Sequence, residues 1–69
     1  MTDEFRAAIQ TLIKYKGRET AYQEEHKKEI VAAFRTYWAH GPSEEEFGVL
    51  MGSIVLFPEM LYIMATAGR

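Results

Sequence analysis

The stretch Ser53–Met64, SIVLFPEMLYIM, decides which folds are open to this chain. It lies in a longer run, residues 47–68, whose only charged residue is Glu59. Apolar side chains cover every side of a helical wheel there, so a helix in this run must be enclosed on all sides. Pro58 interrupts the run, because proline lacks an N–H and clashes with the carbonyl four residues earlier. The sequence predicts a third helix over about 44–67 that is kinked or restarted at Pro58.

A membrane or a protein core could enclose such a helix. The 22 residues of the run could cross ~30 Å of hydrocarbon. Its nine Leu, Ile, Phe and Val residues favour insertion by roughly 3 to 5 kcal/mol, and a central Glu with a central Pro costs about as much. Three glutamates precede the run, and Tyr62 lies inside it, away from an interfacial belt. We therefore favour a soluble protein; the alternative is a small membrane-inserted subunit with Glu59 at mid-bilayer.

The chain is short for a protein that folds alone. A domain of 69 residues buries only about 60% of the surface that its unfolded chain exposes. The absence of cysteine excludes disulfides and fits a reducing compartment, so we expect a cytoplasmic protein. The remaining source of stability is a homo-oligomer, in which a GxxxG pattern permits close helix approach. The predicted interface consists of Gly48, Met51, Gly52, Val55, Leu56, Glu59 and Met60.

Composition and the N-terminal sequence argue against two other classes of protein. The net charge of −2 argues against non-specific nucleic-acid binding, which depends on a basic field. The N-terminal sequence MTDEFRAAIQ lacks a basic segment followed by an apolar one, so no signal peptide is expected.

Two helices are predicted before the apolar run. Apolar residues recur at helical spacing over about 3–16, after a cap at Thr2 or Asp3. Thr20 and Gln23 form a capping-box pattern that predicts a second helix over about 21–40. Gly17 and the pair Gly41–Pro42 are stop signals after the two helices. Together these residues predict an antiparallel helical hairpin.

A second capping-box pattern, Ser43 with Glu46, marks the start of the third helix. The predicted fold is therefore all-α: a helical hairpin plus a kinked apolar third helix, similar to a three-helix bundle and completed by oligomerisation. Tyr37 and Trp38 are expected to close its core, with a partner-protein anchor as the alternative.

Basic and aromatic residues gather around the junction of the first two helices. Cations, an aromatic ring and a helix N-terminus are the ingredients of a phosphate or nucleotide site. The same cations also complement the carboxyl end of the first helix without any ligand, and we favour this interpretation. The candidate residues for an anionic ligand are Lys14, Tyr15, Lys16, Arg18, Tyr22 and Lys27.

Glu59 permits two interpretations. In an apolar setting its pKa would be raised, or it would receive a cation or an arginine across an interface. Alternatively it is the acidic residue of a helix restarted at Pro58, where the N-terminal N–H groups favour a carboxylate. We favour the second interpretation.

No pattern of catalytic, metal-binding or cofactor-binding residues stands out. His26 and His40 are fourteen positions apart, so they fall on different turns of one helix and cannot share a metal within the chain. We expect a non-enzymatic protein without metal or cofactor, which acts by binding a partner protein as an adaptor, inhibitor or regulator. The alternative is an oligomeric binder of a phosphate-bearing small ligand.

Overall fold

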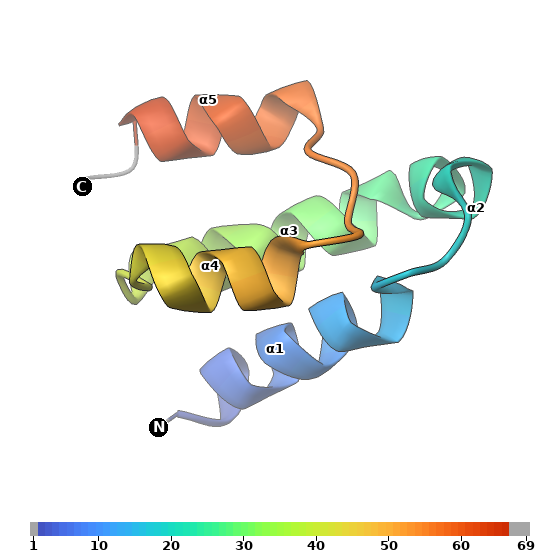
Figure 1. Cartoon of the computed structure of the whole chain (residues 1–69). Helices are drawn as coiled ribbons and strands as arrows, with labels where there is room; N and C mark the ends of the chain where they lie inside the picture. The colour runs from blue at the N-terminus through green and yellow to red at the C-terminus, as the bar shows by residue number, and fades with distance from the viewer. Residues whose placement is uncertain (1, 67–69) are drawn as a thin grey trace.

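A computed structural model describes residues 2–66 of the chain (Figure 1). Within this range all regular structure is helical, which confirms the predicted fold class. The helices are α1 (Asp3–Tyr15), α2 (Thr20–Glu25), α3 (Lys27–Ala39), α4 (Glu44–Met51) and α5 (Pro58–Thr66). The last residue predicted for the third helix, 67, lies outside the described range.

Helix α3 occupies the centre of the molecule. It packs against α1, α2 and α5, while α4 packs against α1 (Figure 1). Thr2 caps the start of helix α1, because its hydroxyl accepts a hydrogen bond from the backbone N–H of Phe5 at 3.1 Å. It ends before Gly17, whose φ of 80° lies in the left-handed region that favours glycine.

The predicted second helix is interrupted at His26, where α2 ends and α3 begins. Its φ of −109° and ψ of 24° are not helical. The predicted capping box at Thr20 is wrong, because Thr20 is the first residue of α2 and Glu19 precedes it without a side-chain capping bond. The Gln23 side chain instead binds backbone groups outside α2.

The predicted third helix consists of two separate helices, α4 and α5, joined by residues 52–57. Gly52 leaves the helical conformation with a ψ of 135°, and Ser53 has a positive φ of 69°. Pro58 is the first residue of α5, where its missing N–H removes no helical hydrogen bond. Over residues 2–66, no helix has both the length and the apolar character needed to cross a membrane.

The capping box at the start of α4 is confirmed. The Ser43 backbone N–H donates to the Glu46 carboxylate at 2.9 Å, and the Glu46 backbone N–H donates to the Ser43 hydroxyl at 3.1 Å.

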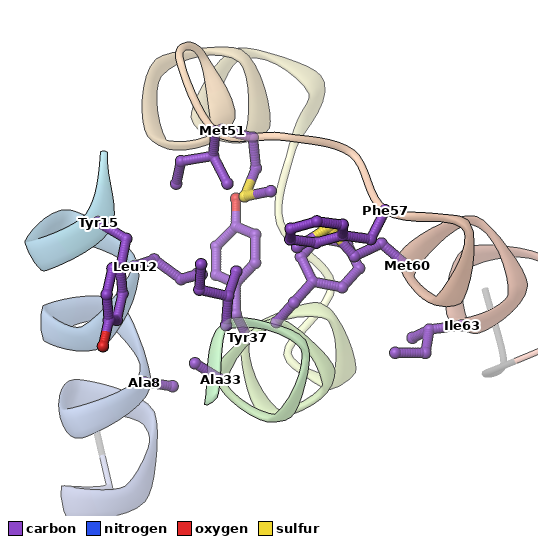
Figure 2. Close-up of a cluster of buried hydrophobic side chains, with 12 residues drawn as sticks. Ala8, Leu12, Tyr15, Ala33, Tyr37, Met51, Phe57, Met60 and Ile63 are labelled. Atoms are coloured by element: carbon purple, nitrogen blue, oxygen red, sulfur yellow. The ribbon is translucent and has the colours of Figure 1, made fainter. Parts of the chain in front are cut away.

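The core lies between α3 and the helices around it (Figure 2). Tyr37 is buried there, as the sequence predicted, and Trp38 packs against the core with its ring stacked on Phe34 at 5.9 Å. The buried apolar residues are Ala8, Leu12, Tyr15, Ile30, Ala33, Phe34, Tyr37, Met51, Ile54, Phe57, Met60 and Ile63.

The surface area shows how far one chain completes this core. The chain exposes 4649 Å², and a folded monomer of 8.0 kDa is expected to expose about 4,450 Å². A single chain therefore buries as much surface as a monomeric domain of its size.

Candidate functional site

The cations predicted to hold an anionic ligand are engaged within the chain. The Lys16 ammonium donates to the backbone carbonyls of Val49 at 2.8 Å and Leu50 at 3.2 Å, and also to that of Gly52. These carbonyls lie at the carboxyl end of α4, where a helix favours a positive charge. Lys16 therefore caps α4 and joins it to the end of α1.

The neighbouring residues Lys14 and Tyr15 both contact Glu29 of α3. The Tyr15 hydroxyl donates to the Glu29 carboxylate at 2.8 Å, and Lys14 lies 3.9 Å from the same carboxylate. Burial, followed by the nearby Glu29 carboxylate, raises the pKa of Tyr15 above its usual value. These contacts hold α1 against α3.

The remaining three predicted ligand residues lie on different segments: Arg18 in the loop between α1 and α2, Tyr22 on α2 and Lys27 on α3. The Arg18 guanidinium lies over the Tyr22 ring at 4.2 Å, and Lys27 forms an ion pair with Glu59 at 2.7 Å. The structure therefore brings Tyr15, Arg18 and Tyr22 together, with the Tyr15 and Tyr22 ring centroids 5.8 Å apart, but directs the ammonium groups of Lys14, Lys16 and Lys27 to three different helices.

The Lys27 contact corrects the first interpretation of Glu59. The hydrogen bond from Lys27 lowers the pKa of Glu59, and so does the backbone N–H at the start of α5. Its side chain is about half exposed. Glu59 is therefore an ionised carboxylate at a helix start and not a buried acid with a raised pKa.

Gln23 is the buried polar residue whose role the sequence did not reveal. It is 1% exposed, and its side chain donates to the carbonyls of Arg18 at 2.8 Å and Ser53 at 3.1 Å. Its carbonyl oxygen accepts from the Val55 backbone N–H at 2.8 Å. Gln23 thus connects the α1–α2 loop to residues 52–57. In sequence, Gln23 resembles the capping partner of Thr20. The sequence therefore did not indicate that Gln23 would connect two loops.

The residues predicted to form an oligomer interface have different environments. Met51 and Met60 are buried in the chain's own core. The backbone N–H of half-buried Val55 is bound to Gln23, and the carbonyl of Gly52 is bound to Lys16. Four of the predicted residues are exposed: Gly48, Gly52, Leu56 and Glu59.

An apolar groove lies between α1 and α4, at the end of the molecule where both helices begin. Its volume is about 330 Å³, within the range of small-ligand pockets. We call it the α1–α4 groove; its lining residues are Phe5, Ile9, Tyr37, His40, Gly41, Pro42, Glu46 and Leu50. Two further apolar side chains on the same helices are open to solvent, Ile13 at 55% and Val49 at 72% exposure.

One carboxylate, that of Glu46, lines this groove, and four more lie in the first turns of the two helices that form it. Asp3 and Glu4 lie in the first turn of α1, and Glu44, Glu45 and Glu46 in the first turn of α4. The Ser43 backbone N–H and then its hydroxyl lower the pKa of Glu46, so this residue stays ionised in mildly acidic solution. The groove therefore combines apolar walls with one lining carboxylate and further acidic residues at the starts of α1 and α4.

Tyr37 forms part of the groove lining, but its hydroxyl is buried. Among residues 2–66 this hydroxyl has no hydrogen-bond partner. Burial, followed by the nearby Glu46 carboxylate, raises the pKa of Tyr37, so its hydroxyl stays neutral.

The two histidines lie at the ends of α3 and face different neighbours. His26 donates through Nδ1 to the Tyr22 carbonyl at 2.9 Å, and His40 donates to the Thr36 carbonyl at 3.1 Å. The His40 ring also packs on Phe5, with the ring centroids 4.3 Å apart. In the described part of the chain, no three His, Asp or Glu side chains are grouped so that they could hold a metal ion.

Comparison of the chain with protein-family models, with curated protein sequences and with solved structures gave no match.

Proposed function

We propose that this chain is a small, non-enzymatic helical protein that acts by binding a partner protein through the α1–α4 groove. The observation that carries this proposal is the groove itself, in which apolar walls from α1 and α4 stand beside the Glu46 carboxylate, with further acidic residues in the first turns of both helices. Binding of this kind needs apolar area, shape and complementary charge, and the groove offers all three.

The chemistry of the groove favours one kind of partner segment. Phe5, Ile9 and Leu50 offer an apolar surface that a single large side chain can fill. The carboxylates of Glu4, Glu45 and their neighbours favour positive charge beside that side chain. The partner segment therefore presents an aromatic or aliphatic residue flanked by lysine or arginine.

Selection from a library of random displayed peptides tests the proposal. We expect the immobilised protein to enrich peptides that combine a large apolar residue with adjacent basic residues. Leu50→Glu should lower the affinity for the selected peptides by about tenfold or more, as loss of a central apolar contact does in other interfaces. The double variant Glu4→Lys, Glu45→Lys should also lower the affinity for these peptides. The loss should be largest at low salt, because exposed charges are screened as salt rises.

The matched control is Leu61→Glu, which places a charge on α5 at an exposed leucine outside the groove. Circular dichroism and thermal melting establish that each variant is folded. The proposal is wrong if no peptide is enriched, or if Leu50→Glu and Leu61→Glu affect the selected peptides equally.

We prefer a partner protein to a phosphate-bearing ligand, because Lys16 and Lys27 already have partners within the chain. The predicted homo-oligomer stays a prediction and involves a different surface.

A further inference from the structure

Helix α5 has a second apolar side that the chain leaves uncovered. Its inner side carries Met60 and Ile63, which are buried against the core. Its outer side carries Pro58, Leu61, Tyr62 and Ala65, all of them exposed. These four positions follow the spacing i, i+3, i+4, i+7, which places them on one face of a helix. We call them the α5 stripe.

The α5 stripe is unusual for a surface that faces only water. Leu61 is 53% exposed and Tyr62 is 68% exposed, and no charged residue lies among the four. A helix that is apolar on both sides is expected to be covered on both sides. Leu56, which precedes α5 in the chain, is a further apolar side chain with 46% exposure.

We infer that the α5 stripe is a dimer interface that pairs with the same stripe of a second copy of this chain. The sizes of the four side chains fit an antiparallel pairing about a two-fold axis between Leu61 and Tyr62. In this arrangement Leu61 of one copy packs beside Tyr62 of the other, and the small Ala65 faces Pro58. Large residues therefore meet at the centre and smaller ones at the ends, as a self-complementary two-fold interface requires.

Charge and area favour a second copy over a charged partner. The stripe offers no charge with which to select an acidic or basic segment, and the net charge of −2 gives only weak repulsion between copies. One helix of nine residues buries less than the roughly 800 Å² per partner of a standard interface. The dimer is therefore weak and forms between chains that are already folded.

Sedimentation velocity over a wide range of protein concentration tests this inference. We expect a reversible monomer–dimer equilibrium with a Kd of the order of 1 to 100 µM, typical of small interfaces. Leu61→Glu should raise this Kd at least about tenfold, since it places a charge at the centre of the interface. Val49→Glu is the matched control, because Val49 is 72% exposed on α4. The dimer Kd of this variant should stay within about twofold of that of the unmodified protein.

Disulfide formation tests the antiparallel geometry, because the natural chain has no cysteine. In the antiparallel dimer, residues 61 of the two copies lie at nearly the same height, about 1.5 Å apart along the helix axis, whereas residues 65 are about 10 Å apart. Leu61→Cys should therefore form a disulfide-linked dimer much faster than Ala65→Cys. Equal rates would overturn the antiparallel arrangement.

A protein that stays monomeric at all concentrations would overturn the inference, and so would an unchanged Kd in folded Leu61→Glu. The inference is independent of the α1–α4 groove, so its failure leaves the peptide-binding proposal unaffected. Conversely, a dimer that enriches no peptide overturns only the proposal for the groove.

Discussion

Gln23 and Val55 are joined by a hydrogen bond between a buried side chain and a loop backbone, with the Gln23 carbonyl oxygen 2.8 Å from the Val55 nitrogen. The same side chain donates to the carbonyls of Arg18 and Ser53. Its carboxamide supplies both the donors and the acceptor that these three backbone groups require, so one residue satisfies two separate loops.

We expect Gln23→Leu to lower the free energy of unfolding by about 2 to 4 kcal/mol, because three backbone groups lose a buried partner. Gln23→Glu should cost at least as much, since a carboxylate would face the carbonyl oxygens of Arg18 and Ser53. Urea denaturation measures both effects. Gln10→Leu, at an exposed position of α1, is the control. A loss no larger than that of the control would contradict the role assigned to Gln23.

Lys16→Met should lower the free energy of unfolding by about 1 to 2 kcal/mol, because it keeps most of the aliphatic side chain and removes the cation that caps α4. Chemical denaturation is again the measurement. Lys28→Met is the control, since the exposed Lys28 side chain forms no ion pair or hydrogen bond among residues 2–66. Equal effects of the two substitutions would show that Lys16 does not act as a cap.

The two buried tyrosines should respond differently to removal of the hydroxyl. Tyr15→Phe loses the hydrogen bond to Glu29 and should destabilise the protein by about 1 kcal/mol. Tyr37→Phe removes a hydroxyl that has no partner within residues 2–66, so it should leave stability unchanged or raise it by up to about 1 kcal/mol. Thermal melting of the two variants tests the difference, and a larger loss for Tyr37→Phe would contradict it.

Acid should weaken the contribution of Glu46 to stability. Its pKa is lowered in the folded protein, so this contribution is present above the unfolded pKa and disappears as pH falls through the folded pKa. We expect the Tm difference between the natural protein and Glu46→Gln to be largest above about pH 5 and to shrink as the pH falls below that. Glu45→Gln, outside the capping box, is the control. A difference that grows in acid would have the wrong sign.

The two glycines of the GxxxG pattern should differ when replaced by alanine. A Cβ at Gly48 would meet no atom within 4 Å, so Gly48→Ala should stabilise the monomer by about 0.5 to 1 kcal/mol through higher helix propensity. A Cβ at Gly52 would lie 3.1 Å from the Gly48 carbonyl oxygen, so Gly52→Ala should give no such gain. Chemical denaturation of the two variants measures this difference in stability. A Gly48→Ala variant less stable than the natural protein would contradict the prediction.

Local sequence patterns predicted those features of the fold that depend on contacts within a single helix. The Ser43 capping box, the all-helical class and the burial of Tyr37 follow from contacts that are close in sequence or from ordinary apolar periodicity. The pattern at Thr20 failed because Gln23 finds better partners in loops brought close by tertiary folding. A residue type that suits both roles cannot reveal which one the folded chain selects.

The candidate sites were harder to predict for the same reason. The basic residues near the end of α1 resemble an anion site in sequence, and only the folded chain shows that Lys16 binds the end of α4. The absence of charge over residues 47–57 suggested one enclosed helix. In the structure Gly52 and Ser53 turn the chain, so that α4 and α5 occupy different positions around α3. The α1–α4 groove depends on the resulting position of α4, which no local pattern specifies.

The bonds that hold residues 52–57 in place also constrain the order in which the chain folds. They join residues 30 to 36 positions apart in sequence, whereas α1 and α3 are joined by the shorter segment 16–26, which contains α2. Closing the longer loop costs more chain entropy and needs the α1–α2 junction as its docking surface. We therefore expect α1 to α3 to associate first and α5 to dock last, which makes α5 the helix whose contacts mainly slow unfolding.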